Sequence, residues 1–197
     1  MNRKGKIWFS TVYFLASQIS NFISSYLLHM FYPERPIVPD LLFDLVPQLL
    51  WLEYTSEPLI LGSILVLFLY IFSYDRKNIS FYFTSLGSVY FIRAFLMILT
   101  PLGRPTGNAT PYGLFKFVGI IQHGMFPSGH VALSFIIYLM IPRDARKGFK
   151  GAAGILCILQ IAVLVFSRGH YAIDIAGGLL ISWTVWSVYV LRKSIRS

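Results

Sequence analysis

Residues 126–130 (FPSGH) and 167–174 (SRGHYAID) each place polar side chains at the start of a long apolar run. Together the two segments contribute two histidines, a carboxylate, hydroxyls and a guanidinium to a chain that is 56% hydrophobic. A charged residue at the centre of a membrane helix costs about 2.5–3.5 kcal/mol on insertion scales, so polar groups kept there usually mark a functional site. The two segments therefore predict where helices begin and where chemistry takes place.

The second segment contains a histidine and a carboxylate at a helical spacing. His170 and Asp174 are four residues apart, which would place them on one face of a helix, one turn from each other. A carboxylate there can accept the proton of one ring nitrogen, which fixes the tautomer and makes the other nitrogen more basic. We interpret His170 as a nucleophile or base that Asp174 orients.

The first segment has the composition of an anion-binding helix start. The free N–H groups of a helix N-terminus, with the Ser128 hydroxyl and the small Gly129, would form a cradle for an anion. His130 follows and could donate a proton to a leaving oxygen. A nucleophilic histidine facing a phosphate cradle and an acidic histidine favours phosphoryl transfer through a phosphohistidine. A metal site is the rival use, but no third histidine or cysteine is spaced to complete it.

Composition places the chain in a membrane. Its mean hydropathy is +0.65, and 17% of its 197 residues are aromatic. We therefore expect an all-α integral membrane protein with one domain over residues 1–197. The expected fold is a bundle of six transmembrane helices, with approximate spans 7–31, 57–74, 79–102, 128–141, 151–166 and 170–191.

The basic residues predict an orientation rather than a nucleic-acid partner. The net charge is +9, but 12 of the 17 basic residues lie at the two termini and in the second and fourth connections, residues 75–78 and 142–150. Because basic residues concentrate on the cytoplasmic side, both termini are expected there. The other connections would then face the outer or luminal leaflet and bring the candidate residues together: Glu57, Arg104, Ser128, His130, Arg168, His170 and Asp174.

Three arginines are candidate substrate ligands. Arg93 lies about ten residues inside the predicted third span, too deep for easy snorkelling, so we expect it to face a polar cavity. Arg104 lies in the Gly- and Pro-rich loop 103–122, which could cap a site or present phosphate ligands. Arg168 stands two residues before His170.

Residues 32–57 differ from the predicted spans. They contain four prolines, which would break any long helix. The short apolar stretch 41–48 is followed by Trp51 and Tyr54. This pattern predicts a segment that lies at the membrane surface with aromatic anchors.

These residues resemble the type 2 phosphatidic acid phosphatase superfamily, which includes lipid phosphatases and sphingomyelin synthases. Residues 127–130 (PSGH) match the central motif as the phosphatases have it. The other phosphatase motifs match less well, since Met97 stands in place of a lysine and Leu164 in place of an arginine.

The sphingomyelin synthase branch is similar over more of the chain. Residues 36–40 (PIVPD) resemble its first motif, and Ser56-Glu57 resembles the pair that opens its second span. Residues 93–102 match the spacing of its second motif, and 170–174 (HYAID) match its fourth. Residues 122–124 depart from the Cys-Gly-Asp of its third motif.

The resemblance implies a reaction and a set of roles. His170 would attack a lipid phosphorus with Asp174 in support, and His130 would protonate the departing alcohol oxygen. Glu57 would join the polar cluster beside them, and neither a metal nor another cofactor would be needed. A second lipid hydroxyl or water would then take the phospho-head-group from His170.

Three functions follow from these features. The first is a phosphotransferase that moves a phospho-head-group from a membrane phospholipid to a ceramide- or diacylglycerol-like acceptor, favoured by residues 36–40, Glu57 and Arg93. The second is a lipid phosphomonoesterase, favoured by Pro127 and Arg104. The third is a non-catalytic lipid-binding membrane protein that keeps the same scaffold.

Overall fold

The computed structural model describes residues 2–105, 124–145 and 148–194. Most of the predicted loop 103–122, residues 122 and 123 of the third motif, and the basic residues Arg146, Lys147 and Arg196 lie outside the described residues. The described residues form these helices: α1 Arg3–Phe31, α2 Leu41–Leu45, η1 Leu50–Leu52, α3 Glu53–Tyr74, η2 Arg76–Asn78, α4 Ile79–Leu99, α5 Gly129–Met140, α6 Phe149–Phe166 and α7 Ala172–Ser194.

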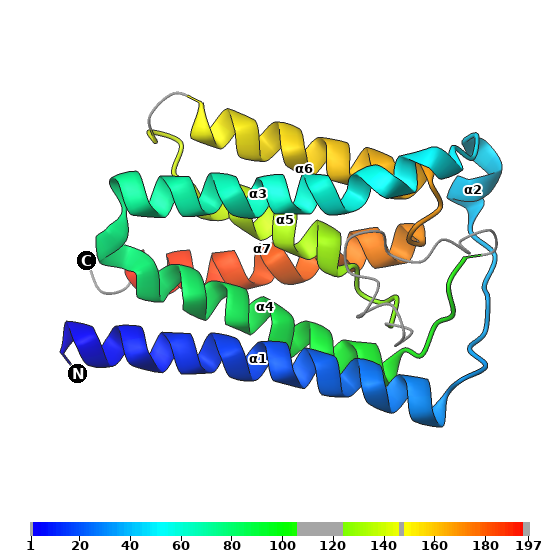
Figure 1. Cartoon of the computed structure of the whole chain (residues 1–197), viewed down its shortest axis with the longest axis horizontal. Helices are drawn as coiled ribbons and strands as arrows, with labels where there is room; N and C mark the ends of the chain where they lie inside the picture. Colours follow the sequence, from blue (N-terminus) through cyan, green and yellow to red (C-terminus); the bar gives the residue numbers. More distant parts are fainter. Residues whose placement is uncertain (1, 106–123, 146–147, 195–197) are drawn as a thin grey trace.

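The long helices run side by side in three tiers (Figure 1). Helix α1 packs along α4, helix α3 packs along α6, and α5 and α7 lie between these pairs. The start of α1 and the end of α7 lie at one end of the bundle. Helices α5 and α7 begin toward the opposite end, which is also where α2 lies.

The all-α membrane character is confirmed, but the six-span count is not. Within the described residues, four helical segments are long and apolar enough to cross a membrane: Leu50–Tyr74, Arg76–Leu99, Phe149–Phe166 and Ala172–Leu191. The predicted spans 7–31 and 128–141 form α1 and α5 instead, and neither is among the four.

Helix α1 is long enough to cross a membrane but is rich in polar residues. Its buried side is mostly serine, with Ser10, Ser17 and Ser24 recurring every seven residues. The Ser10 and Ser17 hydroxyls donate to carbonyls of their own helix, at 2.9 and 2.6 Å, which satisfies them away from water. Small residues allow helices to approach closely in membranes. On α4, a Cβ added at Gly87 would lie 2.7 Å from the Tyr13 ring.

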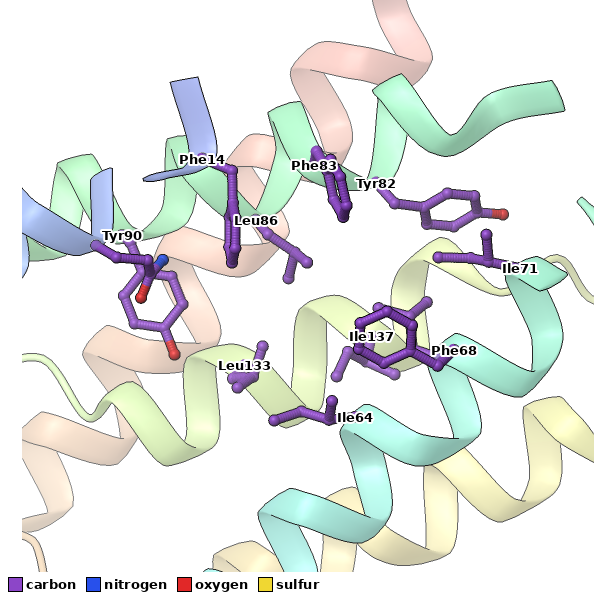
Figure 2. A pocket seen from close by; sticks show the side chains of 12 residues that line it. Phe14, Ile64, Phe68, Ile71, Tyr82, Phe83, Leu86, Tyr90, Leu133 and Ile137 are labelled. Atoms are coloured by element: carbon purple, nitrogen blue, oxygen red, sulfur yellow. The ribbon is translucent and has the colours of Figure 1, made fainter. Parts of the chain in front are cut away.

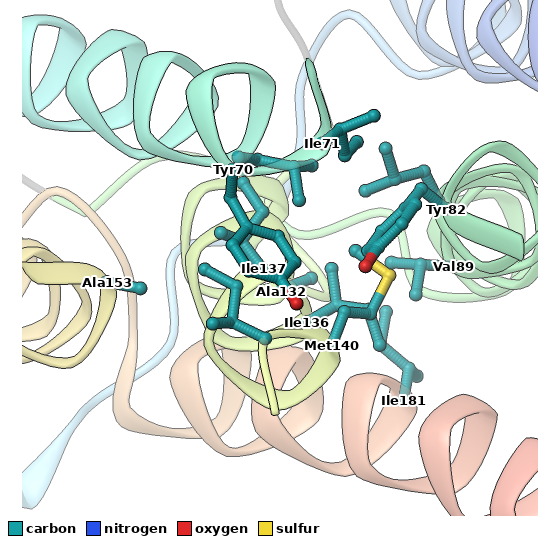
Figure 3. Packing of buried hydrophobic residues seen from close by; sticks show 13 residues of the cluster. Tyr70, Ile71, Tyr82, Val89, Ala132, Ile136, Ile137, Met140, Ala153 and Ile181 are labelled. Atoms are coloured by element: carbon teal, nitrogen blue, oxygen red, sulfur yellow. The ribbon is translucent and has the colours of Figure 1, made fainter. Parts of the chain in front are cut away.

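Helix α5 is short and central. Its 12 residues rise about 18 Å, whereas the hydrocarbon core of a bilayer is about 30 Å thick. The helix contacts α3, α4, α6 and α7. Ile136, Ile137 and Met140 are buried with residues of those helices, among them Tyr70, Tyr82, Ala153 and Ile181 (Figure 3).

An apolar cavity of about 190 Å³ lies between α1, α3, α4 and α5 (Figure 2). Most of its lining is aliphatic or aromatic, and Gln18, Tyr82 and Tyr90 supply its polar atoms. Leu133, one helical turn after His130, belongs to the lining. The lining therefore comes within one helical turn of one of the two histidine segments.

Candidate functional site

The predicted pairing of His170 with Asp174 is present at the start of α7. His170 Nδ1 lies 3.2 Å from Asp174 Oδ2, and both residues are buried. The two do not share a helix as the spacing predicted, because α7 begins at Ala172 and His170 precedes it. With its proton on Nδ1, the ring donates to the carboxylate, and Nε2 keeps its lone pair for a substrate.

Asp174 also shapes the helix start. Its Oδ2 accepts a hydrogen bond from the backbone N–H of Tyr171 at 3.1 Å. A carboxylate three residues into a helix that binds back to the N-cap N–H forms half of a capping box. One oxygen atom therefore holds both the backbone turn and the His170 ring.

The second histidine faces the first. His130, the second residue of α5, lies with its ring centroid 6.1 Å from that of His170, and the ring planes are inclined by 60°. The two segments, 40 residues apart in the chain, thus meet in one place. A tetrahedral phosphoryl group bound there would be within reach of both rings.

The backbone joins the two segments directly. The Ser128 N–H donates to the Asp174 carbonyl at 2.9 Å, while Ser128 Oγ caps α5 by accepting from Val131 N at 3.4 Å. Gly178 allows this contact, because an added Cβ would lie 2.8 Å from the Ser128 carbonyl oxygen. The predicted cradle is therefore fixed to the first turn of α7.

Arg93 reaches the cradle from α4. Its Nε donates to Pro127 O at 3.0 Å, Nη2 donates to Gly124 O at 3.2 Å, and Nη1 donates to Asn21 Oδ1 on α1. A Cβ at Gly129 would lie 2.9 Å from Arg93 Nε, so glycine is needed for this approach. The Arg93 side chain thus donates to these oxygen atoms, and the contacts hold the loop before α5. The polar cavity expected around Arg93 stays a prediction.

The other predicted residues lie on the elements around this pair. Glu57 is buried in α3, beside Ser56, whose hydroxyl accepts from Gln160 Nε2 at 2.7 Å.

Arg104 lies close to Arg35, which the sequence did not single out. Burial lowers the pKa of the Arg35 guanidinium, and the charge of Arg104 lowers it further. The neighbouring Gly103 N–H donates to Pro36 O at 2.9 Å.

Arg168 lies at the end of α6 in a left-handed conformation, with φ +55°. Its N–H donates to Val165 O at 3.2 Å and the Gly169 N–H donates to Leu164 O at 2.9 Å, the bonds of a Schellman cap. Its Nη2 donates to Phe43 O at 2.6 Å, and its guanidinium lies 5.3 Å from the Phe43 ring centroid.

Sequence reasoning missed the part that Asp40 plays in the site. The sequence indicates Asp40 only as part of the motif at residues 36–40, yet its carboxylate accepts a hydrogen bond from the Ala172 N–H in the first turn of α7. An aspartate directly before a short apolar run is a typical helix N-cap, but that local signal points only to α2. Among the residues that the structure describes, no group of three or more His, Cys, Asp or Glu side chains is placed to hold a metal ion.

Comparisons with known proteins identify relatives of this chain. Phosphatidylcholine:ceramide cholinephosphotransferase 2 of Caenorhabditis elegans is 27% identical, over 93% of this chain and 66% of its own length. The corresponding cholinephosphotransferase 1 is 25% identical, over 75% of this chain and 38% of its own. Phosphatidylcholine:diacylglycerol cholinephosphotransferase 2 of Arabidopsis thaliana is 39% identical over 90 residues, 44% of this chain and 29% of that protein.

The chain thus spans less than two thirds of the length of each of these relatives. The resemblance to the sphingomyelin synthase-like branch is confirmed by these matches. A family model described as AtPDCT1/2 matches residues 64–190, which include both histidine segments. Because that match covers more than half of the chain, the protein belongs to the AtPDCT1/2 family.

Proposed function

We propose that this protein is an integral membrane phosphotransferase that acts through a phosphohistidine on His170. The observation that carries the proposal is the geometry of three side chains. His170 Nδ1 lies 3.2 Å from Asp174, and the His130 ring lies 6.1 Å from the His170 ring. A nucleophile with its orienting carboxylate, facing a proton donor, is the arrangement that two-step group transfer needs.

The first step forms the enzyme intermediate. His170 Nε2 attacks the phosphorus of a phospholipid, and the bond from phosphorus to the diacylglycerol oxygen breaks. Protonated His130 gives its proton to that oxygen, so diacylglycerol leaves as a neutral alcohol. Asp174 stabilises the positive charge on the His170 ring.

The second step reverses the roles. Neutral His130 takes the proton of an acceptor hydroxyl, whose oxygen attacks the phosphorus on His170. The bond from phosphorus to nitrogen breaks, and His170 returns to its starting state. Each histidine is thereby restored after one transfer, so no other reactant is required.

The remaining polar groups of the site could bind a phosphate. We assign the start of α5, with Ser128 and Gly129, as the candidate anion site, of the kind that helix N-termini supply. Arg104 and Arg35 place two positive charges near one another, an arrangement that an anion stabilises. We assign Glu57, Arg104 and Arg168 to the polar wall around the phosphate, and Arg93 to holding the loop on which the cradle is built.

The apolar cavity in Figure 2 supports a lipid substrate. Its lining includes Leu133, one turn after His130, and residues of α3 and α4. An engineered dry cavity of about 150 Å³ is enough to hold a small hydrocarbon such as benzene. A cavity of 190 Å³ can take part of an acyl chain whose head-group lies at the histidines.

The relatives' names suggest the substrates. They are cholinephosphotransferases that use phosphatidylcholine with ceramide or with diacylglycerol. We propose that this chain likewise moves phosphocholine from phosphatidylcholine to one of these two acceptors.

The test is a transfer assay in nanodiscs of unlabelled phosphatidylcholine with labelled ceramide or labelled diacylglycerol. Wild type is expected to convert one acceptor into its phosphocholine product. His170→Ala should abolish turnover, and Asp174→Asn should lower kcat by about 10²–10⁴-fold, because an amide disturbs the tautomer that the carboxylate fixes.

His29→Ala is the matched control, because His29 lies at the end of α1 outside the histidine pair. It should retain wild-type turnover. Labelled phosphatidic acid, assayed separately for free phosphate, distinguishes a phosphomonoesterase. Full activity in His170→Ala would reject the nucleophile assignment, and phosphate release without an acceptor product would reject the transferase.

A further inference from the structure

We propose that Asp40 is a positioning residue for the His170–Asp174 pair, because its carboxylate joins the N-termini of two helices. The inference rests on the proposed function of His170. Asp40 Oδ1 accepts from Leu42 N at 2.9 Å and so caps its own helix, α2. Asp40 Oδ2 accepts from Ala172 N at 2.5 Å, at the start of α7 and 132 residues away.

Helix α7 lacks an ordinary cap of its own. The residue at its N-cap position is Tyr171, whereas Ser, Thr, Asp and Asn are the usual N-caps because their short side chains accept from the first turn. The Tyr171 hydroxyl points elsewhere and accepts from Val38 N at 3.4 Å. The first turn of α7 therefore depends on two carboxylates, Asp174 for the Tyr171 N–H and Asp40 for the Ala172 N–H.

Further contacts join the segment around Asp40 to the residues on both sides of His170. Residues 38–43, which we call the strap, touch α7 and the end of α6 on both sides of His170. Before His170, Arg168 Nη2 donates to Phe43 O at 2.6 Å. After it, the Tyr171 ring packs 5.8 Å from the Phe43 ring, centroid to centroid. The turn that carries His170 is thus held from one side by the strap and from the other by Asp174.

Loss of the Asp40 contact should lower the turnover rate. If the Ala172 N–H loses its partner, the first turn of α7 loosens, and with it the placement of His170 against Asp174 and His130. Asp40 does not reach the phosphate itself in this account, so binding of the lipid should change little. A misplacement of about 1 Å can cost about a hundredfold in rate.

Asp40→Ala should therefore lower kcat by about ten- to a hundredfold while the KM for the donor lipid stays nearly unchanged. Asp40→Asn should be intermediate, because an amide offers one acceptor oxygen where the carboxylate offers two. Asp44→Ala is the matched control, since Asp44 is an exposed aspartate of the same helix. It should behave as wild type.

Ala172→Pro tests the same contact from its other side. Proline has no N–H and is well tolerated at the first position of a helix, so it removes the donor to Asp40 and leaves the carboxylate in place. It should lower kcat in the same way as Asp40→Ala. In the double variant the two losses should overlap rather than multiply, as coupled residues do. Losses that multiply would mean that Asp40 acts by another route, and would overturn the proposal.

Hydrogen exchange gives a readout that does not need activity. Exchange of the backbone amides in peptides covering residues 168–176 should quicken in Asp40→Ala and stay unchanged in Asp44→Ala. Unchanged exchange in Asp40→Ala, or unchanged kcat, would overturn the proposal. If wild type formed no transfer product, the proposed function would fail, and the exchange comparison would still decide whether Asp40 holds the start of α7.

Discussion

Gly129, at the start of α5, is closely surrounded by other atoms. A Cβ at this position would lie 2.9 Å from Arg93 Nε, and Arg93 in turn holds Pro127 O and Gly124 O. We predict that Gly129→Ala displaces the arginine and lowers transfer activity by about tenfold or more, as small misplacements do in active sites. The measurement is turnover in nanodiscs.

Gly151→Ala is the control for this change. Gly151 is an exposed residue in the first turn of α6, and an added Cβ meets no described atom within 4 Å. Because alanine is the better helix former by about 1 kcal/mol, this variant should be as active as wild type and no less stable. Equal activity of the two alanine variants would contradict the role given to Gly129.

Arg168 combines a strained backbone with a contact to the strap. A left-handed conformation at a residue other than glycine costs about 1–3 kcal/mol. Arg168→Gly should therefore leave the unfolding temperature unchanged or higher, while activity falls because the bond to Phe43 O is lost. Thermal unfolding and turnover, measured on the same preparation, test both halves.

Arg168→Asn separates the two effects. Asparagine tolerates the left-handed region but carries no guanidinium. It should lose activity as Arg168→Gly does. An asparagine variant with full activity would show that the side chain of Arg168 has no part in the site.

At the scale of elements, the site depends on how closely α7 approaches the start of α5. Gly178 lies at the point of contact, where an added Cβ would meet the Ser128 carbonyl oxygen at 2.8 Å and Ala132 N at 3.1 Å. Backbone atoms cannot rotate away as a side chain can. We predict that Gly178→Ala destabilises the fold by about 1–3 kcal/mol, the usual cost of overpacking.

Thermal unfolding in detergent measures this cost. Gly62→Ala serves as the reference, since its Cβ would meet only the Leu156 side chain, at 3.5 Å, an ordinary contact. A similar unfolding temperature for both variants would mean that α7 can shift away from α5 without penalty.

The elements also show what the sequence could predict. The start of α5 was predictable because Ser128 caps its own helix, so the signal is local. The pairing of His170 with Asp174 was predictable from spacing, although Tyr171 at the N-cap leaves His170 outside the helix. The contact from Asp40 to Ala172 was not predictable, because it joins residues 132 positions apart. The length of the apolar run 7–31 predicts a span, but its polar residues, Gln18 and Asn21 as well as the serines, lower the hydropathy of α1.

At the scale of the whole molecule, the histidine segments and the termini lie toward opposite ends of the bundle (Figure 1). We propose that the termini face the cytoplasm and the histidines the outer or luminal leaflet, in keeping with the positive-inside pattern. The sole cysteine, Cys157, is buried and can be replaced by alanine to give a background without thiols.

Single cysteines at two exposed positions then test the orientation. Asp144→Cys in the α5–α6 connection and Asp44→Cys in α2 should react with a membrane-impermeant maleimide from opposite sides of a sealed vesicle. Asp44→Cys should be labelled from the luminal or outer side. Labelling of both cysteines from one side would overturn the orientation.

The shortness of α5 sets the depth at which the reaction would take place. Lys150 Nζ donates to Ile141 O at 2.8 Å, so the far end of α5 is held by a lysine of the kind that marks a cytoplasmic boundary. In the proposed orientation, the His130 end of α5 would lie about 18 Å from that boundary, within the hydrocarbon core of a bilayer about 30 Å thick. Water is scarce within the hydrocarbon core of a bilayer. A phosphohistidine formed there would more readily meet an acceptor lipid than be hydrolysed.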